Sequence, residues 1–198
     1  IQGPAQNKIN AKFIGKEAHA GVSPEHGISA IQIAAEAISN MKLLRIDEET
    51  TANIGHISGG DATNIVTKEV VFHGEARSLS NEKLKAQTDH MVKCCEEAAK
   101  KYGGKVEMDV DNAYGAFKVD EDAEIVQMVK KACANIGLES NTMKSGGGSD
   151  TNILNDNGIT AVNLAVGMRA VHTLEEHIYI DDLEKTAELV LEIAKVYS

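Results

Sequence analysis

Residues 12–30 read KFIGKEAHAGVSPEHGISA, and the rest of the chain is organised around this stretch. Its first residues continue an alternating apolar pattern that predicts a strand, and the small residues that follow predict a tight turn around His19. Ser23 is placed to cap a helix, and Pro24 suits the first helical position. The stretch therefore predicts a strand, a turn that presents His19, and a helix that starts at Pro24. On these residues alone, an ordinary turn histidine is the simpler explanation of His19.

The sequence around this stretch predicts one compact fold up to about residue 116. The helix after Pro24 is expected to bury an apolar stripe made of Ile28, Ile31, Ala35, Ile38 and Met41. Ser80 is placed to cap a second helix, and Gly103 to end it. Strands are expected on either side of these helices, at residues 7–14, 51–57, 69–79 and 105–111. The order βαββαβ predicts a ferredoxin-like α+β fold, with two helices on one face of a four-stranded antiparallel sheet.

The pattern changes after Phe117 to that of an α/β domain. Helices are expected at 122–136, from Asp150, and after a capping Asp181, and strands at 141–144 and 159–166. The last helix is expected to bury Leu183, Ala187, Val190, Leu191 and Ala194. Two strands are too few for a parallel sheet, so we expect a partial α/β domain whose other strands precede residue 1. The expected segments are 1–6, ending an α/β segment; 7–116, an insertion; and 117–198, the rest of the α/β domain.

Composition excludes several classes of protein. The 198 residues carry a formal net charge of −10, which argues against nucleic acid as a partner because phosphate binding requires clustered Lys and Arg. The chain contains no apolar run of ~18 residues, so no membrane span is expected. No basic amphipathic stretch suggests a membrane surface as a partner. Cys94, Cys95 and Cys133 are odd in number and two are adjacent, which argues against a disulfide framework and for a cytoplasmic location.

Several polar residues are candidates for chemistry, and each has a plainer alternative. His172 follows an expected buried strand and precedes Glu175 and Glu176, and histidine and carboxylate are both common zinc ligands. A catalytic zinc usually takes three protein ligands, however, so a solvated loop histidine also explains His172. Arg77 could grip a carboxylate or form an exposed cross-strand ion pair. Asn64 follows a glycine turn and could bond a ligand or cap its own loop.

The glycine-rich stretch at residues 145–150, SGGGSD, has two interpretations. Glycines before a helix can expose backbone N–H groups to a phosphate. The stretch lacks the Gly-Lys-Ser/Thr ending of a P-loop, and the acidic balance of the chain disfavours a nucleotide. A tight crossing from strand to helix, which needs small residues, explains the stretch at least as well.

Five short motifs follow one another along essentially the whole chain. They are GKEAHAG at 15–21, GGDATNIV at 59–66, EARS at 75–78, GGGSDTN at 146–152, and His172-Thr173 with Glu176. In this order and spacing they resemble the peptidase T-like branch of the two-zinc exopeptidases, relatives of the aminoacylases and the succinyl-diaminopimelate desuccinylases.

The resemblance implies a lid, a catalytic domain and a set of roles. An α/β catalytic domain would bind two zinc ions with a bridging water and use a glutamate as general base. Residues 7–116 would form a ferredoxin-like lid that makes the homodimer, and residues 117–198 the C-terminal part of the catalytic domain. His172 would be a zinc ligand, and His19 would reach the partner's active site and steady the scissile carbonyl. Asn64 and Arg77 would hold the substrate near its carboxylate end.

The resemblance also implies that the other metal ligands and the general base precede Ile1. We therefore expect part of a dinuclear-zinc aminopeptidase of short peptides, such as tripeptides, with the piece itself inactive. One alternative is a non-catalytic ferredoxin-like module for dimerisation or binding. Another is the same family acting on acyl-amino acids, because Arg77 suits any substrate with a free carboxylate.

Overall fold

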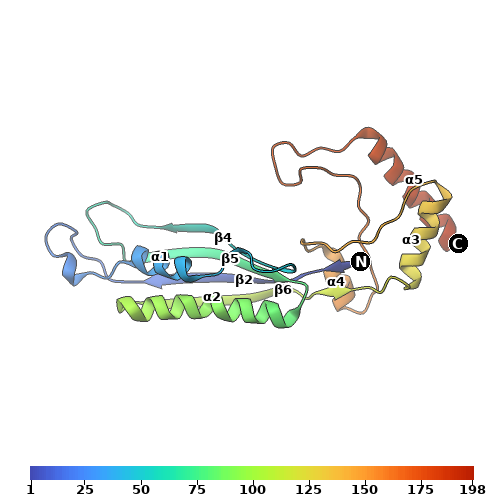
Figure 1. Ribbon diagram of the computed structural model, residues 1–198. Helices are drawn as coiled ribbons and strands as arrows, with labels where there is room; N and C mark the ends of the chain where they lie inside the picture. Colours follow the sequence, from blue (N-terminus) through green and yellow to red (C-terminus); the bar gives the residue numbers. More distant parts are fainter. The chain divides into compact units, whose positions relative to one another are not determined.

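The computed structural model describes residues 1–198, which divide into two compact units. The first, here called the sheet unit, comprises Pro4–Ala116 with Gly146–Gly148. The second, here called the helical unit, comprises Ile1–Gly3, Phe117–Ser145 and Ser149–Ser198. Figure 1 labels the longer helices and strands of both units. No helix in either unit combines the length and the apolar character needed to cross a membrane.

The sheet unit has the predicted ferredoxin-like topology. Its antiparallel sheet has the order β3-β4-β5-β2-β6. The strands are β2 (Ala5–Ile14), β3 (Leu44–Arg45), β4 (Thr50–Gly59), β5 (Glu69–Ser78) and β6 (Lys105–Tyr114). The helices are η1 (Pro24–His26), α1 (Ala30–Asn40) and α2 (Asn81–Tyr102). Without the short β3, the order is βαββαβ, which confirms the α+β prediction.

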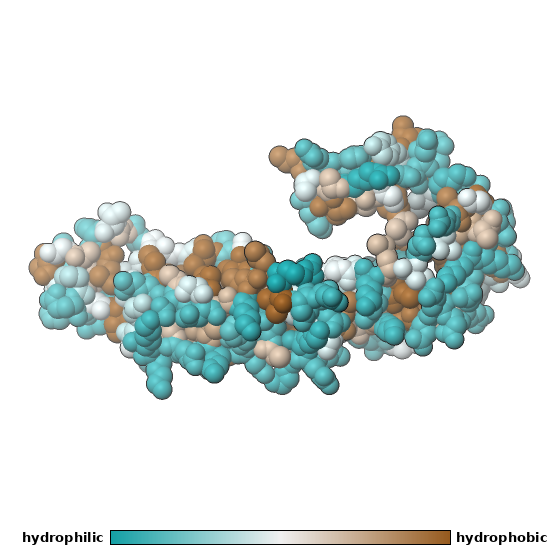
Figure 2. Space-filling view, in the orientation of Figure 1, coloured by the Kyte–Doolittle hydropathy of each residue, from teal (hydrophilic) through white to brown (hydrophobic).

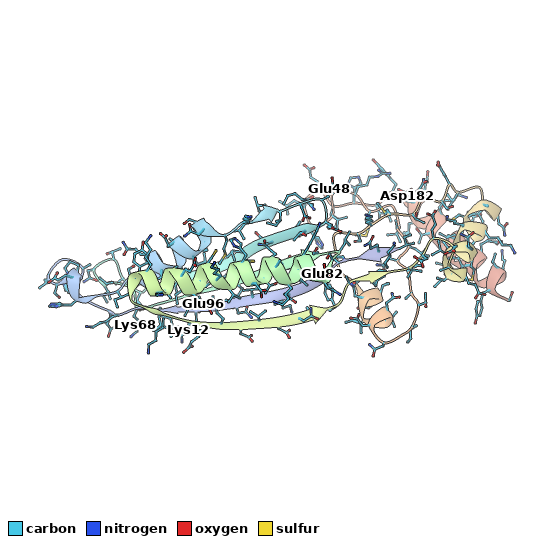
Figure 3. All side chains as sticks on the ribbon, turned by 60° about the horizontal axis from the view of Figure 1, so that its bottom comes forward. Lys12, Glu48, Lys68, Glu82, Glu96 and Asp182 are labelled. Carbon is cyan, nitrogen blue, oxygen red and sulfur yellow. The ribbon has the colours of Figure 1, made fainter.

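One apolar layer holds this unit together, between the sheet and the two long helices. Phe13 and Phe72 are fully buried neighbours on β2 and β5, with ring centroids 5.6 Å apart. Met91 and Cys95 bury the inner face of α2 against them. The outward side of α2, which lies along the strands and carries Glu82 and Glu96 (Figure 3), is hydrophilic along the lower edge of the unit in Figure 2. Ser80 and Gly103 cap α2 as predicted.

The first helix begins later than its sequence predicted. Ser23 makes no capping hydrogen bond with its side chain, and Pro24–His26 is only a 3-10 turn, whereas the Ser29 side chain accepts from the Gln32 N–H and caps α1. The reason is long-range pairing, because Lys16 and Ile28 exchange backbone hydrogen bonds in both directions and keep that stretch extended. The buried face is accordingly Ala30, Ile33, Ala34 and Ala37, and Ile31 is exposed.

The helical unit contains three helices and one short ladder. They are α3 (Glu124–Asn135), α4 (Asp150–Asp156) and α5 (Ile180–Tyr197), with β1 (Gln2–Gly3) paired antiparallel to β7 (Phe117–Lys118). α3 packs against α5 through Ala132, Cys133 and Leu189. α5 is turned relative to the prediction: Leu189 is inward, whereas Leu183, Val190 and Leu191 are more than half exposed, and Asp181 lies in the first turn with Tyr179 as N-cap.

Two expected strands do not form in this unit. Residues 141–144 contribute only an isolated bridge from Lys144 to Gln2, and residues 159–166 are not a strand. A strand is stabilised by backbone hydrogen bonds to a neighbouring strand. Here the side chain of Asn155, rather than a neighbouring strand, bonds both the N–H and the C=O of Ala161. Ile159 and Leu164 are therefore partly exposed rather than buried on both faces.

Candidate functional site

His19 and Asn64 lie together on one projection of the sheet unit. We call this projection the arm; it consists of residues 15–29, which follow β2, and residues 60–68, which precede β5. Three backbone hydrogen bonds join the two loops: Gly15 N–H to Lys68 O at 2.8 Å, Val66 N–H to Ala18 O at 2.9 Å, and Ala20 N–H to Asn64 O at 2.9 Å. The arm is at the end of the sheet that also carries Lys12 and Lys68 (Figure 3).

The arm presents His19 in one defined state. The backbone N–H of Gly21 donates to Nδ1 of the exposed imidazole at 3.1 Å. Because Nδ1 is the acceptor, the neutral ring carries its proton on Nε2. The side chain can therefore offer an N–H donor to a group outside this chain, which a histidine buried beneath its own sheet could not do.

Arg77 lies at the opposite end of the same sheet. β5 pairs with β2 in an unbroken register from Glu69 opposite Ile14, next to the arm, to Arg77 opposite Gln6. The eight residue steps from Glu69 to Arg77 span roughly 27 Å, at about 3.4 Å per residue. Arg77 therefore lies where the chain enters and leaves the sheet unit, since Gln6 also pairs with Tyr114 at the end of β6.

The guanidinium of Arg77 is already paired, but with a residue of its own strand. Its Nε and Nη2 donate to the two carboxylate oxygens of Glu75 at 2.8 and 3.0 Å. The side chains are only 29% and 34% exposed. The hydrogen bonds that Arg77 donates to Glu75 raise the pKa of Arg77, so the guanidinium stays charged at any working pH. The alternative drawn from the sequence was an ion pair across two strands, whereas this ion pair joins two residues of one strand.

The glycine-rich loop makes a close approach to the same end of the sheet unit. A Cβ on Gly148 would lie 2.1 Å from the Tyr114 ring, whereas one on Gly146 would meet nothing within 4 Å. Ser149 and Asn152 close a capping box at the start of α4, which satisfies the helix N-terminus internally. The interpretation as a tight crossing therefore explains the glycine at 148, and the phosphate interpretation gains no support.

His172 lies in a strained loop of the helical unit. It is exposed, with φ at +65°, and Ala170 nearby has φ at +50°. Non-glycine residues in this region cost about 1–3 kcal/mol each and persist only where surrounding contacts hold them. Here Glu176 accepts from the His172 backbone N–H at 2.6 Å, and Arg169 and His177 exchange backbone bonds across the loop. Glu176 thus holds the backbone and leaves the imidazole open to solvent.

This chain's side chains do not by themselves fit the two-zinc centre that the resemblance implies. No three His, Cys, Asp or Glu side chains are grouped so that they could hold a metal ion. The three cysteines are buried and belong to no such group, and burial raises the pKa of the Cys95 thiol to about 12.

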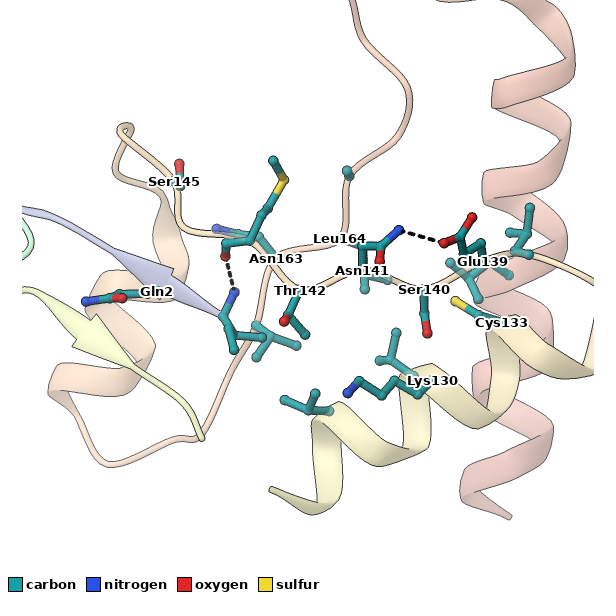
Figure 4. Close-up of a pocket in the computed structure, with 18 of the residues that line it drawn as sticks. Gln2, Lys130, Cys133, Glu139, Ser140, Asn141, Thr142, Ser145, Asn163 and Leu164 are labelled. Carbon is teal, nitrogen blue, oxygen red and sulfur yellow. Dashed lines mark hydrogen bonds between the residues drawn. The ribbon is translucent and has the colours of Figure 1, made fainter. Parts of the chain in front are cut away.

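Sequence reasoning missed a cavity in the helical unit. It has a volume of about 430 Å³ and lies between α3 and the loops at 138–145 and 162–165 (Figure 4). Lys130 and Cys133 line it from α3, and the Asn141 side chain bonds Glu139 at its rim. Its lining comes from segments that are distant in sequence and that lack a local pattern, and it includes none of the four predicted site residues.

Comparison with known proteins gives the family. Residues 3–103 match a family model described as the peptidase dimerisation domain of M20 peptidases. The chain belongs to the M20 peptidase family. Among M20 relatives, the uncharacterized protein YqjE of Bacillus subtilis is 51% identical over 193 residues, covering 98% of this chain and 52% of YqjE.

Two solved M20 structures place the chain in the peptidase T-like branch, as its motifs predicted. Aminopeptidase PepT from Bacillus cereus is 48% identical with a TM-score of 0.86, over 100% of this chain and 53% of that chain. A tripeptidase from Staphylococcus aureus is 47% identical with a TM-score of 0.91, over 99% and 52%. This chain therefore spans about half the length of the M20 relatives it matches.

Proposed function

We propose that this chain is part of a homodimeric M20 aminopeptidase that hydrolyses short peptides. In this proposal residues 7–116 are the lid and dimerisation domain, and residues 117–198 belong to the catalytic domain. The names of the relatives at 47% and 48% identity, a tripeptidase and an aminopeptidase, support the substrate class. The remaining parts of the proposal rest on where the chain places His19, Asn64 and Arg77.

The separation of the arm from Arg77 carries the argument. An extended tripeptide spans at most about 11 Å. The roughly 27 Å of β5 between the arm and Arg77 is more than twice that length. One short peptide therefore cannot touch His19 or Asn64 and also Arg77 of the same chain. A second copy resolves this, with the arm of one subunit completing the site to which the other contributes Arg77.

Each residue type suits its proposed role. Nε2–H of His19 is a donor for the oxyanion that develops when a peptide carbonyl is attacked. Asn64 lies on the same arm as His19, and its side-chain amide can hydrogen-bond the backbone of the peptide. Arg77 matches a terminal carboxylate in shape, because its planar fork of N–H donors can bind both carboxylate oxygens. His172 is the one residue we assign as a metal ligand, with zinc as the expected ion, and the centre needs ligands from outside this chain.

Turnover by the complete protein tests this proposal. The complete protein, purified with its metal, is assayed on a tripeptide, a dipeptide and an N-acyl-amino acid, alongside the 198-residue chain alone. We expect the tripeptide to be the best substrate of the complete protein and the 198-residue chain to be inactive. Preference for the acyl-amino acid would replace the substrate class, and neither hydrolysis nor bound metal would favour the non-catalytic module.

A further inference from the structure

Glu75 leaves one edge of the Arg77 guanidinium open. A guanidinium has a side edge, made by Nε and one terminal nitrogen, and an end edge, made by the two terminal nitrogens. Glu75 occupies the side edge through Nε and Nη2. The hydrogen bonds of Arg77 go to Glu75, and Nη1 and the second hydrogen of Nη2 are not used in them. The end edge is therefore still able to form a second bidentate pair.

Glu75 is itself held from behind. Gln6, on the neighbouring strand β2, is 7% exposed, and its Nε2 donates to Glu75 Oε2. The register places Gln6 directly opposite Arg77, so its amide reaches diagonally to Glu75 across the same face of the sheet. The three side chains form one row, from a buried amide through a carboxylate to a guanidinium, on two strands in the middle of the sheet.

We propose that Glu75, backed by Gln6, is a positioning residue that fixes Arg77 so that its end edge receives the terminal carboxylate of the peptide substrate. The inference rests on the proposed function and adds how that site selects its substrate. A free arginine side chain has many rotamers, and binding would otherwise have to remove that conformational entropy. Fixing the side chain in advance removes that cost from the binding step.

The pair also explains selection by geometry rather than by charge. Glu75 cancels the formal charge of Arg77, so the site gains little from attracting just any anion. What remains is a planar fork of two N–H donors, which matches a planar carboxylate bidentately. Because Glu75 uses the other edge and Gln6 holds it there, substrate binding does not have to displace it.

Kinetics with a matched pair of substrates tests the positioning role. The complete protein is assayed on a tripeptide with a free carboxylate and on the same tripeptide as its C-terminal amide. Glu75→Ala should raise KM for the free tripeptide about tenfold with kcat little changed, and should leave the amide unaffected. Glu75→Gln, which keeps the size and one acceptor, should lie between Glu75→Ala and the wild type.

Two further variants make the result specific to Arg77. Arg77→Ala should make the two substrates alike, and Arg77→Ala with Glu75→Ala should be no worse than Arg77→Ala, because Glu75 acts through Arg77. Glu36→Ala is the matched control, since it removes another part-buried glutamate with an ion pair, to Lys101 at 2.7 Å on the helix layer. The inference is overturned if Glu75→Ala affects both substrates equally, lowers KM, or adds to Arg77→Ala.

Calorimetric binding of the same two peptides separates this inference from the proposed function. If the wild type hydrolyses neither peptide but binds the free tripeptide more tightly, and Glu75→Ala removes that difference, the aminopeptidase proposal fails and the positioning role stands. If the wild type hydrolyses the tripeptide and Glu75→Ala changes nothing, the reverse holds. If the wild type neither hydrolyses nor binds them, both fail.

Discussion

Mixing two inactive variants tests whether His19 completes the active site of the partner subunit. His19→Ala removes the donor on the arm, and His172→Ala removes the proposed metal ligand, so each homodimer should be inactive. Random reassembly of equal amounts makes about half of the dimers mixed, because a two-fold dimer forms from either chain with equal chance. In each mixed dimer, one site combines the intact His172 of one chain with the intact His19 of the other.

The expected recovery is therefore about one quarter of wild-type activity, from half of the dimers with one working site of two. The value takes His172 to share a site with Arg77 of its own chain, as proposed above, and the arm to come from the partner, because the arm lies roughly 27 Å from Arg77 within one chain. If instead His19 served the site of its own chain, every site of a mixed dimer would lack one residue. Mixing would then recover nothing.

The assay is tripeptide hydrolysis by complete protein coexpressed from two differently tagged genes. Mixed dimers purified through both tags should show about half of wild-type activity, since each has one intact site. Mixing His19→Ala with Asn64→Ala is the matched control, because both changes lie on the arm and no mixed site is intact. If purified mixed dimers of His19→Ala and His172→Ala had no activity, His19 would not complete the partner's active site.

Three further predictions concern the fold. Gly148→Ala should lower the free energy of unfolding by about 1–3 kcal/mol, because its Cβ would lie 2.1 Å from the Tyr114 ring, whereas Gly146→Ala has open space and should not destabilise; equal melting temperatures would contradict this. Cys95, whose pKa is about 12, should resist iodoacetamide at pH 8 in the folded chain and react in guanidinium, as read by mass spectrometry. Hydrogen bonds from Lys101 and Asn40 hold the pKa of Glu36 below its ordinary 4.5, so the stability that Glu36 contributes is complete above pH 4.5 and is lost as the pH falls through the lower folded value. Glu36→Gln should therefore make the melting temperature less sensitive to pH in that acidic range. An unchanged dependence of the melting temperature on pH would count against the ion pair.

Local patterns were enough to predict most of the sheet unit. Alternation in β2 and β5, and the caps Ser80 and Gly103 of α2, are signals within a few residues of one another, and they appear as predicted. The start of α1 was wrong because backbone pairing of Lys16 with Ile28 overrides the capping signal of Ser23. The predicted buried face of α5 was wrong because that helix is apolar on two sides, so the periodicity of its apolar residues does not say which side packs against α3.

The candidate site shows the same division. The fold class, the family and the residues to examine could be predicted from the sequence, because these depend on side-chain periods and on short motifs that lie close together along the chain. Three features needed the folded chain: Asn64 lies beside His19, Arg77 is a strand's length away, and Glu75 occupies one edge of its guanidinium. Strand pairing and register join residues far apart in the sequence, and no local pattern encodes which partners they choose.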